Sequence, residues 1–332
     1  MPKEYNKMKK NIALVTGGNS GESVISIKSA EVISNSLDKE KYAVHTIVLQ
    51  GSNWEYIAPD QSRQQVDKND FTIMVNGKKI VFDCVFIGMH GTPGEDGKLQ
   101  GYFDMLGIPY NFSGVLESAV TFNKDICLKL AKEYGAITAK AVLLRKGEAI
   151  DVKKIVEVTG LPCFVKPVSG GSSICMSKVK TMEELQPAID LAFTIDSEVH
   201  AEEFIEGTEV TCGILQRGKE LIALPLTEIV SSREFFDYTA KYDAALAEEI
   251  TPARVPEEVH KKCKETSLML FEKFNLRGVS RFDYIVKNGV PYFLEVNTIP
   301  GMSAASIVPK QAKSMGITLG ELFEILIENA LQ

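Results

Sequence analysis

The stretch that decides the fold is GVSRFDYIVKNGVPYFLEVN, residues 278–297. Two strand-forming runs flank Asn288-Gly289, the strongest short-range signal for a β-hairpin. Side chains alternate between the two faces of a strand, so Arg281 shares a face with Asp283, and Glu295 shares a face with Asn297. The opposite face is apolar and is predicted to be buried; it carries Phe282, Leu294 and Val296.

This hairpin predicts a cation site. A two-residue turn can bring Asp283 across from Glu295, with Asn297 on the same face. Carboxylates packed so closely repel unless a cation neutralises them, and carboxylate and amide oxygens suit Mg²⁺ or Mn²⁺. Magnesium is commonly shared with nucleotide phosphates, so a metal-nucleotide site is one interpretation. A surface pair of strands with solvated acids is the other.

A bound nucleotide needs cations and backbone amides around its phosphates, and two lysines are candidates. Lys166 lies in CFVKPVSGGSS, residues 163–173, where Gly170 and Gly171 let the backbone approach an anion. Lys124 is the second candidate. An ordinary turn explains the glycines equally, because the chain has neither a Walker loop nor the dinucleotide fingerprint.

Two loops near the N-terminus are candidate substrate sites. TGGNSGES, residues 16–23, joins a buried strand to a helical pattern; Glu22 there either favours the helix dipole or binds a substrate ammonium. MHGTPGEDGKLQG, residues 89–101, places His90 just after another buried strand, where ligands of α/β sheets bind. A loop histidine can also be incidental.

The order of patterns divides the chain into three units. Residues 1–119 alternate strands and helices, which predicts a doubly wound parallel sheet. Residues 120–206 predict a smaller α+β unit, and residues 207–332 a mainly antiparallel sheet. Within the third unit, YTAKYDAALAEEITPA, residues 238–253, has no clear period and is either a lid or a surface helix.

Composition narrows the class of protein. The 332 residues are 45% hydrophobic and 24% charged, as in globular proteins. The net charge of -7 disfavours nucleic acid and anionic membranes as partners, which are themselves negative. No run approaches the roughly 20 apolar residues of a membrane helix, and the N-terminus does not fit a signal peptide, so we expect a cytoplasmic protein. The six cysteines form no CxxC motif and predict reduced, packed thiols.

Taken together, seven segments resemble, in order, the signature segments of the D-alanyl-D-alanine ligase family of the ATP-grasp superfamily. They are GGNSGESVIS, HGTPGEDGKLQG, FVKPVSGGSS, AEEFIEGTEVT, YTAKY, GVSRFDYIV and LEVNTIPGM. The resemblance covers nearly the whole chain. It implies a three-domain ATP-grasp fold that binds ATP between the last two units. The implied reaction joins two D-alanines through an acyl phosphate, for peptidoglycan synthesis, and family members are commonly homodimers.

The resemblance also implies roles for single residues. Asp283, Glu295 and Asn297 would hold two Mg²⁺, or Mn²⁺, against the phosphates of ATP, which Lys124 and Lys166 would contact. The other implied ATP contacts are Ser172, Ser173, Glu202, Glu203, Ile205, Glu209 and Lys241, of which Lys241 would meet the transferring phosphoryl group.

On the substrate side, the resemblance implies that Arg281 and the backbone amide of Gly301 stabilise the oxyanion. Further implied contacts are Glu22 with the first ammonium, His90 near the first carboxylate, and Ser306 with Ile307 at the second carboxylate. Ser172, Tyr242 and Glu22 resemble a triad that ties three loops over the site.

Two residues depart from the family pattern, and alternatives stay open. Cys175 stands where the family commonly has Gly, and Glu203 where it often has Lys. The Lys241-Tyr242 pair favours an amino acid over D-lactate as second substrate. One alternative is another ATP-grasp ligase with a different second substrate, and another is a nucleotide-binding sensor. A third is a nicotinamide oxidoreductase, but this chain lacks the glycine spacing of that class.

Overall fold

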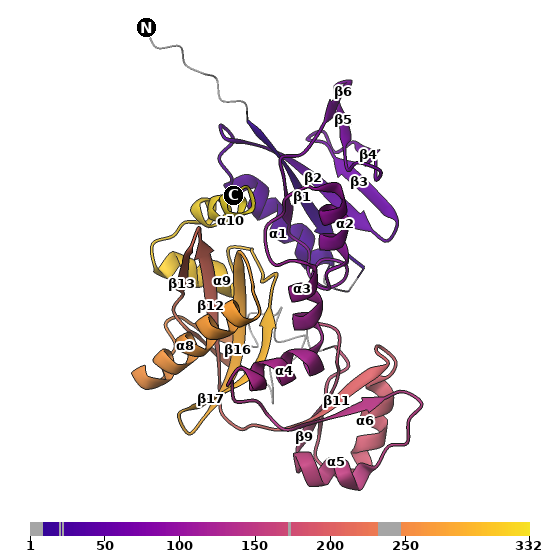
Figure 1. Ribbon diagram of the computed structural model, residues 1–332, viewed down its shortest axis with the longest axis vertical. Coiled ribbons are helices and arrows are strands. Elements are labelled where there is room, and N and C mark those ends of the chain that lie inside the picture. The colour runs from indigo at the N-terminus through magenta and orange to yellow at the C-terminus, as the bar shows by residue number, and fades with distance from the viewer. Residues whose placement is uncertain (1–8, 20, 22, 172–173, 232–246) are drawn as a thin grey trace.

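The computed structural model describes residues 9–19, 21, 23–171, 174–231 and 247–332. Within these residues the strands form three larger sheets and one separate two-stranded sheet. The larger sheets lie in three lobes, which we call N-terminal, central and C-terminal (Figure 1). The mixed α/β fold expected from the sequence is confirmed, while domain boundaries at residues 119 and 206 stay a prediction.

The N-terminal lobe contains a sheet of order β4-β3-β2-β1-β7. Its middle is parallel, because β1 (Lys10–Gly17) pairs with β2 (Tyr42–Gln50) and with β7 (Cys84–Ile87). The predicted parallel sheet is confirmed for these strands. Four short antiparallel strands, β3 to β6, were not predicted; they are Asn53–Ile57, Arg63–Gln65, Ile73–Val75 and Lys78–Ile80.

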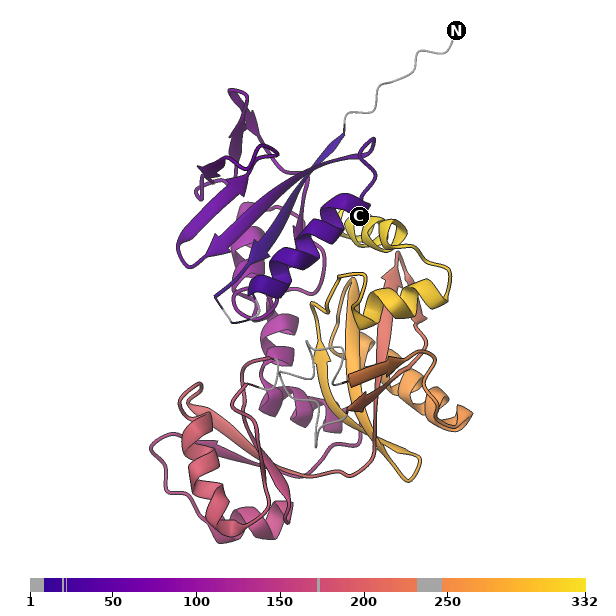
Figure 2. The same ribbon diagram turned by 180° about the vertical axis from the view of Figure 1, so that it is seen from behind.

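The last helix of the chain packs on this first lobe. α10 (Leu319–Ala330) contacts both α1 (Ser23–Ser36) and β7, and Figure 2 shows it beside α1. The rings of Phe86 and Phe323 meet edge to face, with centroids 5.8 Å apart. Such buried apolar contacts hold α10 on the N-terminal lobe. The lobe also contains α2 (Lys98–Leu106).

The central lobe has an antiparallel sheet of order β10-β9-β11-β8. Alternating residues of its strands, such as Val165 and Val199, are fully buried in one apolar cluster with α5 and α6. The other face carries polar side chains, including Lys166 and His200. The elements are β8 (Ala141–Arg145), α5 (Val152–Thr159), β9 (Cys163–Pro167), β10 (Ser177–Val179), η1 (Met182–Glu184), α6 (Leu185–Ala192) and β11 (Glu198–Glu203).

The C-terminal lobe has an antiparallel sheet of order β15-β14-β12-β16-β17, with β13 paired to β12. The sequence pattern over residues 220–230 is divided into two strands around Pro225, which has no N–H to donate. The elements are β12 (Thr208–Arg217), β13 (Glu220–Ala223), β14 (Thr227–Ser231), β15 (Ala247–Ile250), α8 (Glu257–Lys273), β16 (Val279–Lys287), β17 (Val290–Asn297) and α9 (Ile307–Ser314).

The β16–β17 hairpin contains a β-bulge that changes one prediction. From the turn, the strands pair in simple register as far as Tyr284 with Phe293, which would place Asp283 opposite Leu294. A shift between Asp283 and Tyr284 leaves one extra residue on β17, so Asp283 pairs with Glu295. Phe293 therefore faces the core at 1% exposure, and the prediction that Leu294 lies on the buried face was wrong because it is the bulged residue.

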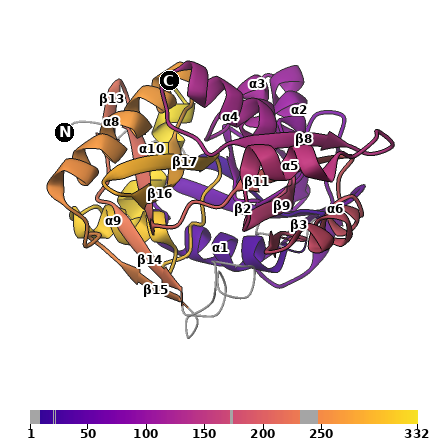
Figure 3. The same ribbon diagram turned by 90° about the horizontal axis from the view of Figure 1, so that it is seen from below.

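Two helices connect the lobes. α3 (Val115–Phe122) and α4 (Lys124–Glu133) follow the N-terminal lobe, and α4 contacts β17 of the C-terminal lobe. Seen from below, α4 lies between the side that holds β17 and the side that holds β11 (Figure 3). Among the described residues, no helix has the length and apolar character needed to cross a membrane.

Candidate active site

The polar face of the hairpin is organised around Asp283, a buried residue of β16. Arg281 donates from Nε to Asp283 Oδ1 and from Nη2 to Oδ2, both at 2.9 Å. Asn297 Nδ2 donates to Oδ2 at 2.9 Å, and Thr211 of the neighbouring strand β12 donates to Oδ1 at 2.6 Å. Both carboxylate oxygens are thus held in place by hydrogen bonds.

Arg281 carries a permanent charge in this site. Burial by itself would lower the pKa of Arg281, but the carboxylates of Asp283, Glu295 and Glu95 outweigh burial and raise the pKa above its ordinary value. Because the fork of the guanidinium is bound to Asp283 on two atoms, its position is fixed. A fixed cation is what stabilisation of a developing oxyanion requires.

Glu295 and Lys124 face each other beside the hairpin. Lys124 Nζ lies 3.5 Å from Glu295 Oε2 and donates to the backbone oxygen of Gly170 at 2.6 Å. Lys124 is the first residue of α4, whose N-cap Asn123 accepts a hydrogen bond from Ile126 N at 3.0 Å. The helix start therefore places the lysine between the hairpin and the glycine loop.

A pocket opens where these elements meet. Its wall combines the end of β17, the start of α4 and the glycine loop, and it includes one acid from the N-terminal lobe. The lining residues are Glu95, Thr121, Phe122, Lys124, Gly170, Gly171, Glu295, Val296, Asn297 and Thr298. The structure thus brings together Lys124, Glu295 and Asn297, which were predicted from distant parts of the sequence.

Two residues of this site were missed by sequence reasoning. Glu95 lines the pocket, accepts a hydrogen bond from Gly91 N at 2.7 Å and acts on the charge of Arg281. Glu95 could have been found from the sequence, because it lies in HGTPGEDGKLQG, a segment already predicted to be near a ligand site. Thr211 orients Asp283, and its signal was a hydroxyl in an otherwise buried strand.

The predicted nucleotide residues of the central lobe lie on β9 and β11. Lys166 Nζ is 3.0 Å from Glu202 Oε1, and both side chains are nearly buried. Glu202 Oε2 is buried and has no hydrogen-bond partner among the described residues, so it is available to a donor of a ligand. Lys140 N donates to Glu203 Oε2 at 3.3 Å, which gives Glu203 a backbone partner in this protein.

The other predicted nucleotide residues surround this pair less closely. Ile205 is buried at 6% exposure just after β11, and Glu209 lies on β12 opposite Ile285. Cys175 has φ +54°, a left-handed conformation that favours glycine, which explains why a glycine would suit this position. The structure therefore identifies a backbone reason for the family preference from which this chain departs.

The predicted substrate residues gather around the segment that follows β17. His90 Nδ1 of the N-terminal lobe lies 3.1 Å from the backbone oxygen of Ile299. Ser306 begins α9 as its N-cap, with Oγ 2.8 Å from Ser303 Oγ, and Ile307 is buried. A Cβ on Gly301 would lie 2.7 Å from Ser306 Oγ, so a side chain at this position would collide with Ser306.

Five predicted site residues lie outside the described residues: Glu22, Ser172, Ser173, Lys241 and Tyr242. Of residues 238–253, predicted to form a lid or a surface helix, residues 238–246 also lie outside the described residues, and residues 247–250 form strand β15. The roles of these residues stay predictions.

The donor atoms present fit a hard divalent cation. In the described part of the chain no three His, Cys, Asp or Glu side chains gather, and the candidate set instead has two carboxylates and one amide. Asp283 and Glu295 are directly opposite in the strand ladder, and Asn297, whose Nδ2 donates to Asp283 Oδ2 at 2.9 Å, has its amide oxygen as the third candidate ligand. All-oxygen donors of this kind suit Mg²⁺ or Mn²⁺ and disfavour softer metals.

The fold is that of the ATP-grasp class of ligases. Family models described as D-ala D-ala ligase N-terminus and D-ala D-ala ligase C-terminus match residues 11–113 and 130–328. The chain therefore belongs to the D-alanine–D-alanine ligase family. The ligase class and the family expected from the sequence are confirmed.

Individual relatives agree with this assignment over almost their full length. The D-alanine–D-alanine ligase of Bacteroides fragilis (strain YCH46) is 45% identical, over 97% of this chain and 99% of that protein. A solved structure of the VanG D-Ala:D-Ser ligase from Enterococcus faecalis has a TM-score of 0.86 and 33% identity, covering 97% of this chain and 100% of that one. The Bacillus anthracis D-alanine–D-alanine ligase complexed with ATP has a TM-score of 0.77 and 31% identity, covering 97% of each chain.

Proposed function

We propose that this enzyme joins two D-alanines to D-alanyl-D-alanine for peptidoglycan synthesis, converting ATP to ADP and phosphate. The observation that carries the proposal is the pairing of Asp283 with Glu295 beside Lys124 and the glycine loop. This arrangement offers oxygen donors to a cation and a lysine to a phosphate within one pocket. The relative from Bacillus anthracis, whose structure is a complex with ATP, supports the same choice of nucleotide.

In the proposed first step, a carboxylate oxygen of one D-alanine attacks the γ-phosphorus of ATP, and the bond to the β-phosphate oxygen breaks. The products are D-alanyl phosphate and ADP. Lys124 and Lys166 hold the phosphates, and Lys241 meets the transferring group. Two Mg²⁺, or Mn²⁺, held by Asp283, Glu295 and Asn297 would neutralise phosphate charge. Phosphoryl transfer depends mainly on this kind of positioning and charge stabilisation.

In the second step, the amine of the other D-alanine attacks the acyl carbon, and the tetrahedral intermediate expels phosphate as the amine loses a proton. Arg281, fixed by its two bonds to Asp283, and the amide of Gly301 stabilise the oxyanion. The first D-alanine is bound by Glu22 and lies near His90, while Ser306 and Ile307 receive the second carboxylate. Glu22, Ser172 and Tyr242 close the site.

The nucleotide base fits the polar side of the central lobe. Glu202, Glu203 and Ile205 line the adenine edge, Glu209 binds the ribose, and Ser172 with Ser173 contacts the phosphates. Glu202 Oε2, which has no hydrogen-bond partner among the described residues, supports this placement, because an exocyclic amine could donate to it.

The test supplies ATP, Mg²⁺ and D-alanine and measures phosphate release and dipeptide. We expect both products with D-alanine and neither with L-alanine. Phosphate released with L-alanine but not with D-alanine would contradict the proposal. A parallel reaction with D-alanine plus D-serine or D-lactate tests the second candidate function, a ligase with a different second substrate, which the likeness to the D-Ala:D-Ser ligase favours.

We also propose that the enzyme acts as a homodimer in the cytoplasm, on the strength of the family resemblance. Light scattering of the purified chain tests the first part: a mass near 73 kDa, twice the 36.6 kDa of the chain, is expected. A mass of one chain at micromolar concentration would contradict it.

A further inference from the structure

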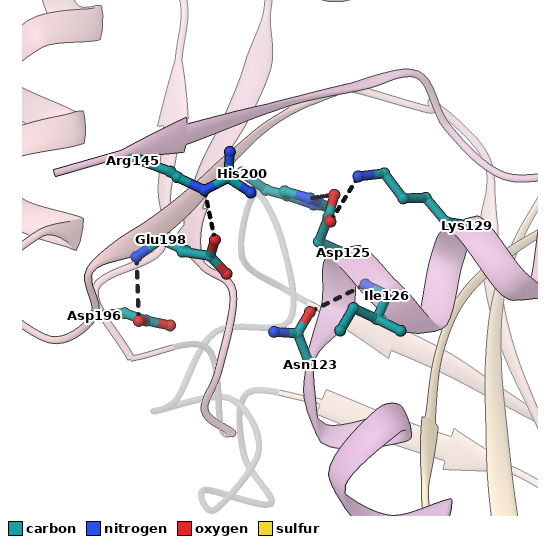
Figure 4. Close-up of polar contacts among 8 residues, drawn as sticks. All are labelled: Asn123, Asp125, Ile126, Lys129, Arg145, Asp196, Glu198 and His200. Atoms are coloured by element: carbon teal, nitrogen blue, oxygen red, sulfur yellow. Dashed lines mark hydrogen bonds and ion pairs between the residues drawn. The ribbon is translucent and has the colours of Figure 1, made fainter. Parts of the chain in front are cut away.

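A buried pair of polar side chains joins α4 to the central sheet. His200 of β11 is 2% exposed, and its Nε2 lies 3.0 Å from Oδ1 of Asp125, the second residue of α4. Lys129, one helical turn later, donates to Oδ2 of Asp125 at 2.7 Å. Figure 4 shows the imidazole of His200 and the carboxylate of Asp125 pointing toward each other from the two elements.

Each member of this pair is adjacent to a lysine predicted to bind phosphate. Asp125 directly follows Lys124 in the chain. His200 is paired with Lys166 in the β9–β11 ladder. The bond between Asp125 and His200 therefore joins the helix that carries Lys124 to the strand ladder that carries Lys166.

The protonation state of the pair is defined by its surroundings. Burial lowers the pKa of His200, the charge of Lys166 lowers it further, and Asp125 and Glu202 oppose this only in part. A neutral His200 donates one hydrogen bond, from Nε2 to Asp125, and its Nδ1 has no partner among the described residues. The lowered pKa favours the neutral imidazole beside the two lysines.

The glycine loop is attached to the same two elements. Lys124 N donates to Val168 O at 3.1 Å, and Lys124 Nζ donates to Gly170 O at 2.6 Å. Ser169 N donates to Oδ2 of Asp196, just before β11, at 2.7 Å. Helix, loop and sheet therefore form one unit around the pocket, and the Asp125–His200 bond joins buried side chains of α4 and β11 within it.

We propose that Asp125 and His200 are positioning residues that hold Lys124 and Lys166 at the spacing that binds the triphosphate of a nucleotide. Two apolar side chains could fill the same space without the cost of burying polar groups, so the pair is retained for the orientation that a hydrogen bond imposes. The inference rests on the proposed function in one respect, that both lysines bind phosphate. Neither Asp125 nor His200 is among the residues that line the pocket.

The test compares binding of ATP with binding of adenosine, which lacks phosphates, by isothermal titration calorimetry. In His200→Leu we expect the Kd for ATP to rise on the order of tenfold, which is the size of effect that loss of a hydrogen bond to a charged group produces. The Kd for adenosine should be unchanged. His200→Gln, which keeps a donor near Nε2, should restore ATP binding. Lys129→Met removes the other partner of Asp125 and should leave both constants unchanged.

A double-mutant cycle identifies the route of the effect. If His200 acts through the position of Lys124, then Lys124→Met and the double variant with His200→Leu have nearly the same Kd for ATP. The inference would be overturned if the losses of ATP affinity in the two single variants add fully in the double variant. It would also be overturned if His200→Leu loses ATP and adenosine affinity equally, or if it binds ATP as tightly as the wild type. Thermal melting of each variant checks that the comparison is made between folded proteins.

The outcomes separate this inference from the proposed function. If the wild type binds ATP and makes dipeptide while His200→Leu binds ATP equally well, the positioning role alone is wrong. If the wild type does not bind ATP, the proposed function is wrong, and the positioning role fails with it.

Discussion

The β16–β17 hairpin and the contact between α4 and β11 both orient charged groups of the pocket, but they do so over very different distances along the chain. In the hairpin, Asp283 and Asn297 are 14 residues apart, whereas Asp125 and His200 are 75 residues apart. Strand alternation and a short turn are enough to bring the first pair together. The second pair depends on how α4 packs against the central sheet, and no local sequence pattern predicts that packing.

Even within the hairpin, local reasoning has a limit. Alternation correctly assigned Asp283, Glu295 and Asn297 to one face, but it assigned Leu294 to the core in place of Phe293. A two-residue turn alone would pair Asp283 with Leu294. The bulge shifts the register by one residue, so that Asp283 pairs with Glu295 instead. Four predictions test this difference between local and long-range organisation, from the largest effect to the smallest.

The largest effect is expected from Phe293→Ala. Phe293 is 1% exposed within the core of the C-terminal lobe, so its loss should lower the free energy of unfolding by about 3–5 kcal/mol. Leu294→Ala is the matched control and should cost only about 1 kcal/mol, because Leu294 is half-buried. Urea denaturation measures both, and the reverse order would mean that simple alternation holds and the bulge does not.

Glu295→Ala should reduce kcat on the order of 10²–10³-fold, by analogy with the loss of other groups that stabilise transition-state charge. The fold should survive, since the Glu295 side chain is 28% exposed and is not part of the apolar core. Glu265→Ala, with a carboxylate that is 64% exposed on α8, is the control and should keep wild-type turnover. Steady-state kinetics and circular dichroism give the answer; turnover near the wild-type level in Glu295→Ala would show that the metal site lies elsewhere.

Thr211→Val tests the support of the hairpin from its neighbouring strand. The substitution keeps the shape but removes the 2.6 Å hydrogen bond to the buried Asp283, which should lower the free energy of unfolding by about 1.5–3 kcal/mol. Thr211→Ser keeps the hydroxyl and should recover part of this loss. Equal stability of the Val variant and the wild type in urea would mean that Thr211 does not hold Asp283.

The smallest effect concerns the long-range pair and pH. Burial lowers the pKa of His200 below its ordinary value of 6.5, so between the lowered pKa and 6.5 the unfolded chain binds more protons than the folded one. Stability should therefore decrease as pH falls below 6.5. His45 has a pKa lowered in the same direction and contributes similarly, so His200→Gln should reduce the slope without abolishing it. An unchanged slope in urea titrations at several pH values would contradict a neutral, buried His200.

The sequence allowed the parallel strands, the long helix of residues 257–273 and the hairpin to be predicted, because each has a strong period or turn signal. The strands of residues 53–80 were missed because they are only three to five residues long, and their pairing with neighbouring strands defines them. Glu95 and His200 were missed as site residues for a related reason. Glu95 acts through its charge on Arg281, and His200 through its hydrogen bond to Asp125, and both partners lie far from them in the sequence.

Manganese binding tests most directly the central claim that the hairpin register builds a metal-nucleotide site. Electron paramagnetic resonance of Mn²⁺ would be recorded with one equivalent of a nonhydrolysable ATP analogue, for the wild type and for Glu295→Gln. We predict two bound Mn²⁺ per chain in the wild type and a loss of at least one in the variant. The same number and affinity of bound Mn²⁺ in both proteins would contradict the claim.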